Sequence, residues 1–327
     1  MSSSDNWNRP VSRRGFLGAG GLGVATLILG RTDALAFPRS KPGYGHPRHD
    51  PGGLIYLPRG FQYRIISEVG STLSTGVPVP GDHDGIAAFP GPGKTTVLVR
   101  NHELGYMDRT EGSVVGQNPY DREERGGTTG IVVGPDHREI SSFVISSGTR
   151  NNCAGGATPW GTWLTCEEDR TTDHGYIFEV DPRAPENDPS KTPIRGMGFF
   201  SHEAVGIDSA TSIAYLTEDD FRGAVTTNPE DERPGASRTS FLYRCRPNTH
   251  PVKPGDLHKG GRLQVLALEE KSRYNADFAV PAQPFGVVWR DVDPEDPHAD
   301  ARYKDAARFN RLEGAHLAGG HFGSTTP

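Results

Sequence analysis

Acidic side chains recur at the ends of strand-like segments. Three such segments are residues 96–103, 162–168 and 213–220. Carboxylates that converge repel each other and cannot all stay ionised unless cations lie among them. Hard cations such as Ca²⁺ prefer oxygen ligands. We therefore interpret these acids as candidate Ca²⁺ ligands because they recur, although each one taken alone is more typical of a solvated loop.

Cys153 is the cysteine whose surroundings indicate chemistry. It lies in a run of small residues, 151–156, where the backbone can approach a ligand closely. Among carboxylates, a thiolate would suit a transition metal such as iron better than calcium. A buried thiol beside a turn is the alternative. Cys166 and Cys245 lie in apolar alternation typical of structural cysteines, and whether they form a disulfide stays open.

A faint internal repeat connects these residues. Each acid-terminated segment follows a small-residue segment with a polar group, and these segments are residues 82–85, 152–155 and 201–204. Residues 311–314 open the same pattern a fourth time. Repeats of roughly 50–65 residues built from short strands favour a β-propeller, in which equivalent positions of different blades converge on one axis.

The elements around the repeat are strands bounded by turn residues. The strand-like runs are residues 61–69, 95–100, 130–133, 140–146, 162–166, 176–180, 213–217, 241–245, 263–268 and 285–289. Only residues 301–309 have the pattern of a helix. The 42 glycines and 27 prolines show no collagen period and favour a loop-rich β architecture. We predict an all-β fold, specifically a β-propeller of four-stranded blades.

The N-terminus has the pattern of a twin-arginine export signal. Ser12-Arg13-Arg14-Gly15-Phe16-Leu17 precedes a weakly apolar, Gly-rich run and then Ala34-Leu35-Ala36. The apolar run is shorter than the roughly 20 residues that span a bilayer, so we expect no stable membrane anchor. The predicted organisation is a signal at 1–36, a linker at 37–53 and one domain at 54–327. Export by the twin-arginine machinery implies a periplasmic or extracellular protein.

Charge and motif content exclude several classes. The formal net charge is −6, and no basic block follows the first fifteen residues, so we expect no nucleic-acid binding. The sequence contains no HExxH, no paired CxxC and no EF-hand loop. These absences argue against a zincin, a zinc ribbon and a helix-loop-helix calcium site. We expect a monomer.

The motifs together resemble the PhoX-type alkaline phosphatases, an exported family of calcium- and iron-dependent phosphomonoesterases built on a β-propeller. The resemblance covers the twin-arginine signal and residues 101–103, 148–168, 201–204, 215–219 and 308–314. The run from Cys153 to Glu168 is its most specific part. Family members continue beyond the segment that resembles residues 321–325, so the resemblance predicts a propeller that is incomplete at its C-terminus, with open strand edges.

The resemblance also implies roles for single residues. Cys153 is expected to ligate Fe³⁺, and Arg311 to bind a phosphate oxygen of the substrate, so both are assigned to catalysis. Further metal ligands for Fe³⁺ and Ca²⁺ are expected at Glu168, Glu203 and Glu313, with Glu218 and Asp219 as weaker candidates. The segment Asn101-His102-Glu103 could supply ligands or structural caps, and we favour a structural role for His102.

Three functions are compatible with these residues. The first is an exported, metal-dependent phosphomonoesterase that releases inorganic phosphate from small phosphate esters, with activity that depends on the incomplete propeller keeping its site. The second is a non-catalytic calcium-binding propeller or scaffold. The third is a calcium-dependent esterase or lactonase, a chemistry that also uses axial acids and Ca²⁺ but needs no thiolate.

Overall fold

The computed structural model describes residues 43–50, 52–105, 112–220, 239–276, 279–280, 283–318 and 321–325. The chain divides into two compact units, Met1–Arg64 and Ile65–Pro327. The predicted export signal at 1–36 lies outside the described residues. In the first unit, Arg48 and Leu57 form an isolated β-bridge, and the Tyr63 hydroxyl donates to Asp50 over 2.6 Å. Among the described residues, no helix has the length and apolarity to cross a membrane.

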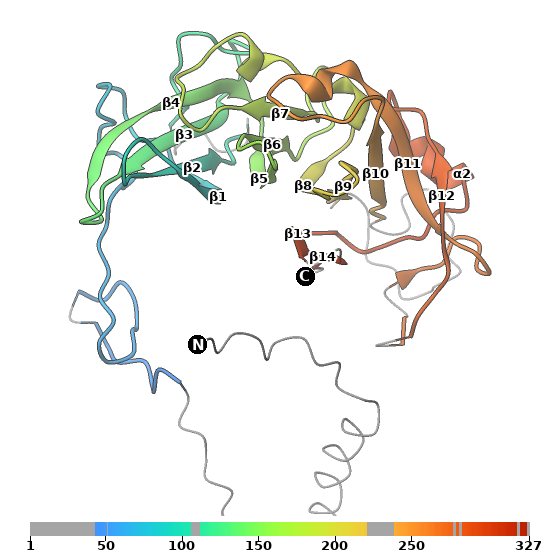
Figure 1. The fold of residues 1–327 in the computed structure, drawn as a ribbon, viewed down its shortest axis with the longest axis horizontal. Helices are drawn as coiled ribbons and strands as arrows, with labels where there is room; N and C mark the ends of the chain where they lie inside the picture. The colour runs from blue at the N-terminus through green and yellow to red at the C-terminus, as the bar shows by residue number, and fades with distance from the viewer. Residues whose placement is uncertain are drawn as a thin grey trace, which may run out of the picture. The chain divides into compact units, whose positions relative to one another are not determined.

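The described part of the second unit is built from antiparallel sheets that follow one another along the chain (Figure 1). The first sheet contains β1 (His83–Pro90), β2 (Thr96–His102), β3 (Gly126–Val133) and β4 (Glu139–Thr149), in that order. The second contains β5 (Asn152–Ala157), β6 (Trp163–Glu167) and β7 (Ile177–Val180). The all-β prediction is confirmed.

The third sheet runs from β8 to β12, again with each strand paired to the next in the chain. Its strands are β8 (His202–Ile207), β9 (Ala214–Glu218), β10 (Leu242–Pro247), β11 (Gly261–Leu268) and β12 (Val287–Asp291). A hairpin of β13 (Ala315–Ala318) and β14 (His321–Ser324) follows. Four strands therefore occur in the first sheet, whereas the second has three and the third has five in the part of the chain that the structure describes.

Helical structure among the described residues is short. The 3₁₀ turns are η1 (Pro189–Lys191), η2 (Arg195–Met197) and η3 (Asp256–Lys259), and the α-helix is α2 (Pro297–Tyr303). The predicted helix at 301–309 was wrong in its bounds. The helix begins earlier because Asp296 caps it, accepting from the Ala299 N–H over 3.3 Å, and Pro297 occupies the first turn. It ends before Asp305, which has a φ of 53°.

The predicted strand at 61–69 was also wrong. This segment has strand-like apolar alternation, but it pairs with no other described strand. Several of its apolar side chains are exposed, among them Phe61, Ile65 and Val69. Apolar alternation stabilises a strand only when a partner supplies the hydrogen-bond ladder and a core covers one face.

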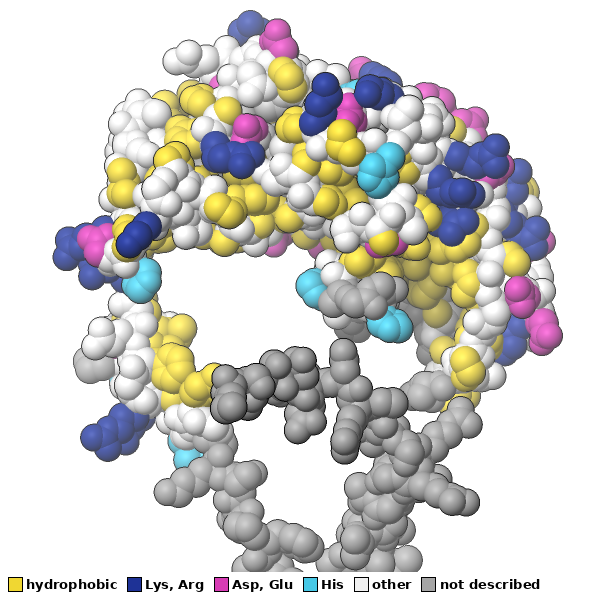
Figure 2. Space-filling model, viewed as in Figure 1, with side chains coloured by type: hydrophobic (Ala, Val, Ile, Leu, Met, Phe, Trp, Pro, Cys, Tyr) yellow, Lys and Arg dark blue, Asp and Glu magenta, His cyan; other side chains and the backbone are white. Residues whose placement is uncertain are grey.

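Apolar clusters join consecutive sheets. Phe89 and Val99 of the first sheet pack with Trp163 and Val180 of the second. A larger cluster contains residues of the second and third sheets, including Cys166 and Cys245. All three cysteines are free and buried, so no Cys166–Cys245 disulfide forms. The face in Figure 2 shows Lys and Arg interspersed with Asp and Glu, without separation by sign.

Candidate metal centre

The first two strands of the three sheets pair in the same way. At the start of each first strand, His83 pairs with His102, Asn152 with Glu167, and His202 with Glu218. The register then slips in all three sheets, with a bulge that contains Asp84 in β1, Cys153 in β5 and Glu203 in β8. By this shared register the three residues occupy equivalent positions. Bulges re-aim side chains, so all three can be turned in the same direction relative to their sheets. The first strands β1, β5 and β8 are neighbours, and β13 lies against β8.

A second set of equivalent residues follows the second strands. The backbone N–H of each donates to the carbonyl of the residue that precedes the first strand of its own sheet. These hydrogen bonds are Glu103 to Asp82 (2.9 Å), Glu168 to Asn151 (2.9 Å) and Asp219 to Ser201 (3.1 Å). The repeat predicted from sequence is therefore present in the backbone, and it brings one acid from each second strand beside the bulges.

The residue just before each of these acids has a structural role. Glu167 accepts from the N–H groups of Gly175 and Tyr176 over 2.8 and 3.1 Å, and from His174 Nδ1 over 2.8 Å. The equivalent residue of the first sheet is His102. Its Nδ1 donates to the Gly81 carbonyl over 2.7 Å, and burial lowers its pKa to about 3. The predicted structural role of His102 agrees with this geometry.

Glu218 belongs to the same structural layer. Its carboxylate accepts from the Phe241 N–H over 3.0 Å and from His298 Nδ1 over 2.7 Å. With Asp220 and His298 it forms a buried group that Arg170 also approaches, at 3.7 Å from Glu218 and 3.4 Å from Asp220. The structure thus places Glu218 in a different group from the other predicted ligands.

The remaining predicted ligands come together in two overlapping groups. Ligand atoms of Cys153, Glu168 and Glu203 all lie within 4.8 Å of one another. Those of Glu203, Asp219 and Glu313 also lie within 4.8 Å of one another, so Glu203 is common to both groups. Cys153 is 2% exposed and Asp219 is 1% exposed. One thiol and four carboxyls are therefore concentrated in a largely buried space.

The electrostatics of this space disfavour additional negative charge. Burial, reinforced by the charges of Asp219, Glu103 and Glu203, raises the pKa of Glu168 to about 10. Burial and the neighbouring Glu313 raise the pKa of Glu203 to about 8, against the effect of a hydrogen bond from Cys153. Without cations, carboxyls in this group keep protons at neutral pH. Bound cations would replace those protons, which is the behaviour expected of metal ligands.

Cys153 is suited to complete a metal site. Its Sγ lies 3.3 Å from the His202 carbonyl and 3.4 Å from the Glu203 carbonyl. Burial, with the charges of Glu203 and Glu168, raises the pKa of the thiol well above its ordinary value. A bound cation would therefore have to compensate the negative charge of the thiolate. The donor set of one thiolate and several carboxylates fits a transition metal together with hard cations.

Arg311 is fixed at the edge of the group by two acids. Its Nε donates to Asp219 Oδ1 over 2.8 Å, and its Nη2 donates to Asp219 Oδ2 over 2.5 Å and lies 3.1 Å from Glu313. The Asp219 contact raises the pKa of the guanidinium. Arg311 has a φ of 55°, and the equivalent residues Asp82 and Asn151 have φ values of 44° and 43°. This conformation at a non-glycine residue occurs at three of the four equivalent points, with Ser201 as the exception.

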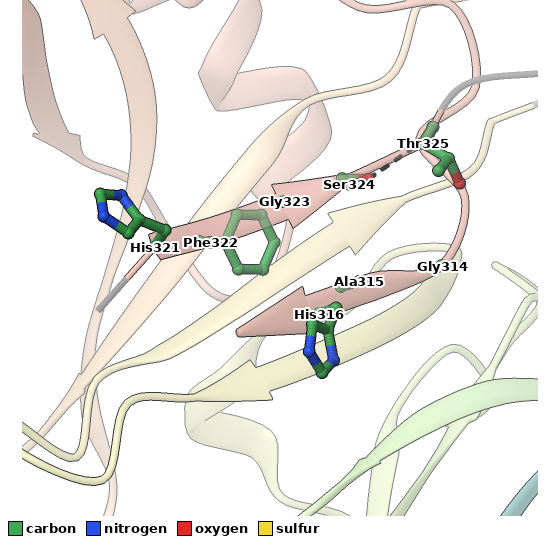
Figure 3. A pocket seen from close by; sticks show the side chains of 8 residues that line it. All are labelled: Gly314, Ala315, His316, His321, Phe322, Gly323, Ser324 and Thr325. Carbon is green, nitrogen blue, oxygen red and sulfur yellow. Dashed lines mark hydrogen bonds between the residues drawn. The ribbon is translucent and has the colours of Figure 1, made fainter. Parts of the chain in front are cut away.

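Glu313 is held in place by the hairpin that follows it. Its N–H donates to the Thr325 carbonyl over 2.8 Å. Phe322 of β14 packs on Tyr215 of β9, with a ring-centroid distance of 5.1 Å. The hairpin also lines a hollow of about 610 Å³ (Figure 3). Its histidines, His316 and His321, belong to different strands, and none of the acids of the metal centre lines it.

Sequence reasoning assigned no ligand role to Asp84 and left Glu103 undecided. By register, Asp84 is equivalent to Cys153 and Glu203, and Glu103 is equivalent to Glu168. Burial and the neighbouring Asp84 charge raise the pKa of Glu103 to about 7. The signal that could have identified them is the repeat itself, because residues 82–85 and 101–103 contain both acids at the repeated positions.

The raised carboxyl pKa values predict how the stability of the metal-free protein depends on pH. Glu203 has a folded-state pKa of about 8 and an ordinary value of 4.5. Between these values the folded chain holds a proton that the unfolded chain has released, so the free energy of unfolding falls as pH rises. With a chelator present to keep the protein metal-free, we expect its Tm to fall by roughly 5–10 °C from pH 5 to pH 8. Circular dichroism melts measure this.

The metal-loaded protein is the control for this prediction. In the metal-loaded protein these carboxylates bind cations instead of holding protons. Its Tm should therefore fall much less over the same pH range. A metal-free Tm that stays constant or rises between pH 5 and pH 8 would show that these carboxyls are ionised without a cation, contrary to the electrostatic argument.

The comparisons with known proteins concern most of the described chain. A family model described as "Alkaline phosphatase PhoX" matches residues 42–324. A solved structure described as Pseudomonas fluorescens PhoX in complex with vanadate, a transition state analogue, is similar with a TM-score of 0.53 and 18% identity. The match covers 80% of this chain and 63% of that one, which is less than two thirds of its length. No curated protein matches the chain.

Proposed function

Because the chain belongs to the alkaline phosphatase PhoX family, we propose that it hydrolyses phosphate monoesters with the help of bound metal ions. The observation that carries the proposal is the buried group of Cys153, Glu168 and Glu203, whose ligand atoms lie within 4.8 Å of one another. Vanadate is described as a transition state analogue for the similar Pseudomonas fluorescens protein, which agrees with phosphoryl chemistry in that protein.

The proposal includes a propeller architecture. Its support is the repeated pairing of first and second strands, together with the contacts of β5 with β1 and β8. In that architecture the three sheets and the β13–β14 hairpin are blades, or parts of blades, whose first strands face one axis. The acids then converge because they occupy the same position in each repeat.

The ions we propose are Fe³⁺ and Ca²⁺. Cys153 would hold the iron, while Glu168, Glu203, Asp219 and Glu313 would hold iron and calcium between them. When bound, the cations would neutralise a phosphate monoester and activate an oxygen nucleophile. We leave Glu218 out of this set, since its carboxylate already accepts from Phe241 and His298.

Arg311 is the proposed substrate-binding residue. Asp219 holds its Nε and Nη2, while Nη1 donates to no residue in the described part of the chain. A guanidinium held in this way can donate from Nη1 to a phosphate oxygen without first paying the conformational entropy of a free arginine. Its side chain is 30% exposed, so it remains accessible to a small substrate.

The site of action that we propose is the periplasm or the extracellular space. The support is the twin-arginine pattern at residues 12–17, which predicts transport by the twin-arginine machinery. Small phosphate esters are the proposed substrates. A monomer without nucleic-acid or membrane partners remains the working expectation.

Metal removal followed by reconstitution tests the proposed function. We expect chelation to reduce hydrolysis of an aryl phosphate at alkaline pH by at least about 100-fold, because cation stabilisation of the transition state contributes several kcal/mol. Adding iron and calcium together should restore turnover. Turnover that is unaffected by chelation would contradict the metal-dependent reaction.

The same preparation separates the alternatives. A calcium-dependent lactonase would hydrolyse a lactone with calcium alone and would keep that activity in Cys153→Ala. A non-catalytic scaffold would bind calcium without turnover of either substrate.

A further inference from the structure

The carboxamide of Asn101 joins the first sheet to the segment that contains Cys153. Asn101 lies near the end of β2 and is fully buried. Its Nδ2 donates to the Cys153 carbonyl over 3.0 Å and to the Ala154 carbonyl over 2.8 Å. Its Oδ1 accepts from Trp163 Nε1 over 3.1 Å and from Thr165 Oγ1 over 3.0 Å. All four hydrogen-bonding positions of the amide are used.

This pattern of hydrogen bonds is matched to the β-bulge. Consecutive carbonyls of a regular strand point in opposite directions, so one side-chain nitrogen cannot reach both. The register of β5 slips between Asn152 and Gly155, and there both carbonyls face Asn101. The amide therefore satisfies the buried Cys153 carbonyl and the half-buried Ala154 carbonyl, which the bulge removes from the ladder.

Close packing against β1 of the first sheet also restricts the bulge. A Cβ on Gly85 would lie 2.7 Å from the Cys153 carbonyl oxygen and 2.8 Å from the Ala154 Cα. β1 and Asn101 thus confine the backbone of Cys153. With the backbone held, Sγ lies near the His202 and Glu203 carbonyls of β8, on the side of the candidate metal centre.

Among the three sheets, only the first has an amide side chain at this position of its second strand. By register, the positions equivalent to Asn101 in the second and third sheets are Cys166 and Thr217. Thr217 Oγ1 accepts from the Ala204 N–H of its own sheet over 2.9 Å. Of these three side chains, Asn101 holds the bulge that contains the thiol.

We propose that Asn101 is a positioning residue for Cys153: its amide locks the β5 bulge and thereby sets the thiol for metal binding. The inference rests on the proposed function in that it takes Cys153 as a metal ligand. It adds a residue whose side-chain amide bonds only to protein groups among the described residues. Residues that orient metal ligands typically change metal affinity by about 10–100-fold when they are replaced.

Asn101→Asp is the sharpest variant for the test. It keeps an acceptor for Trp163 and Thr165 and replaces only the donor nitrogen that faces the two carbonyls. Thr128→Val is the matched control, because Thr128 is also fully buried and pairs with Asn101 across β2 and β3. Its hydroxyl bonds Ser146 of β4 over 2.8 Å.

The measurement is titration of the chelator-treated protein with Cd²⁺, read from thiolate-to-metal charge-transfer absorbance. Subtracting the Cys153→Ala signal isolates Cys153. We expect Asn101→Asp to weaken this binding by at least about 10-fold, and Thr128→Val to change it by less than about twofold. Unchanged Cd²⁺ affinity in a folded Asn101→Asp protein overturns the proposal. Absence of a Cys153-dependent signal in the unaltered protein also overturns it.

A second variant covers the outcome in which Asn101→Asp does not fold. Trp163→Phe removes one donor to Oδ1 and should weaken Cd²⁺ binding by about threefold, whereas unchanged affinity overturns the proposal. The readout needs no turnover. A Cys153-dependent Cd²⁺ signal that is sensitive to Asn101, in a protein without phosphatase activity, would therefore support the positioning role while rejecting the proposed function.

Discussion

Replacing Cys153 with alanine is expected to reduce kcat/KM for an aryl phosphate by more than about 100-fold and to remove iron from the purified protein. The 100-fold figure is the upper range for residues that only orient metal ligands, so loss of a ligand should exceed it. Cys153 is the one thiol in the group with Glu168 and Glu203. Steady-state kinetics on reconstituted protein, together with elemental analysis, measures both effects.

Cys245→Ala is the matched control for this prediction. Cys245 is also buried, at 4% exposed, but its Sγ lies 3.3 Å from the Gly196 carbonyl and it belongs to the apolar cluster between sheets. It should keep its iron content and turnover while losing some stability, since the change removes only packing. If Cys153→Ala instead kept both iron and turnover, the thiol would not be a ligand.

The convergence of the site residues could be predicted because the repeat is visible in residue types. Small-residue segments precede strands that end in acids, and this pattern predicted that the polar residues of both would converge, while the family resemblance assigned Cys153, Glu168, Glu203 and Glu313 as ligands. The ligand groups in the structure contain all four. Radial repetition is sufficient for this prediction, because it depends on position within the repeat and not on details of packing.

The sequence could not tell which acid of each strand end faces the site. Glu167 and Glu168 are adjacent and chemically alike, yet Glu167 accepts from His174 while Glu168 lies with Cys153. The same division separates Glu218, which bonds His298, from Asp219. The deciding partner of Glu218 is 80 residues away in the chain, so no local pattern contains it.

The first strand of each sheet was not predicted as a strand, for a physical reason. β5 reads NCAGGA and contains no β-branched or aromatic residue, so its intrinsic strand propensity is low. Packing requires these small residues: a Cβ on Gly156 would collide with the Val205 carbonyl of β8. Tertiary contact between neighbouring sheets thus overrides local propensity where the site is built.

Replacing Arg311 with lysine is expected to lower kcat/KM for an aryl phosphate by roughly 10–100-fold. Lysine cannot reproduce the fork in which Nε and Nη2 contact Asp219 while Nη1 stays available, and a hydrogen bond to a charged group contributes about 1.5–3 kcal/mol. Most of the loss should appear in kcat if the contact strengthens as charge develops on the phosphoryl oxygens.

Arg183→Lys controls for the loss of a guanidinium as such. Arg183 forms an exposed ion pair with Asp181 at 2.9 Å and should be replaceable without a change in turnover. Inorganic phosphate inhibition adds an independent readout, because Arg311→Lys should weaken product binding as well as catalysis. If Arg311→Lys kept both kcat/KM and phosphate affinity, Arg311 would act only as the partner of Asp219 and Glu313. The phosphate oxygens would then be bound by other groups.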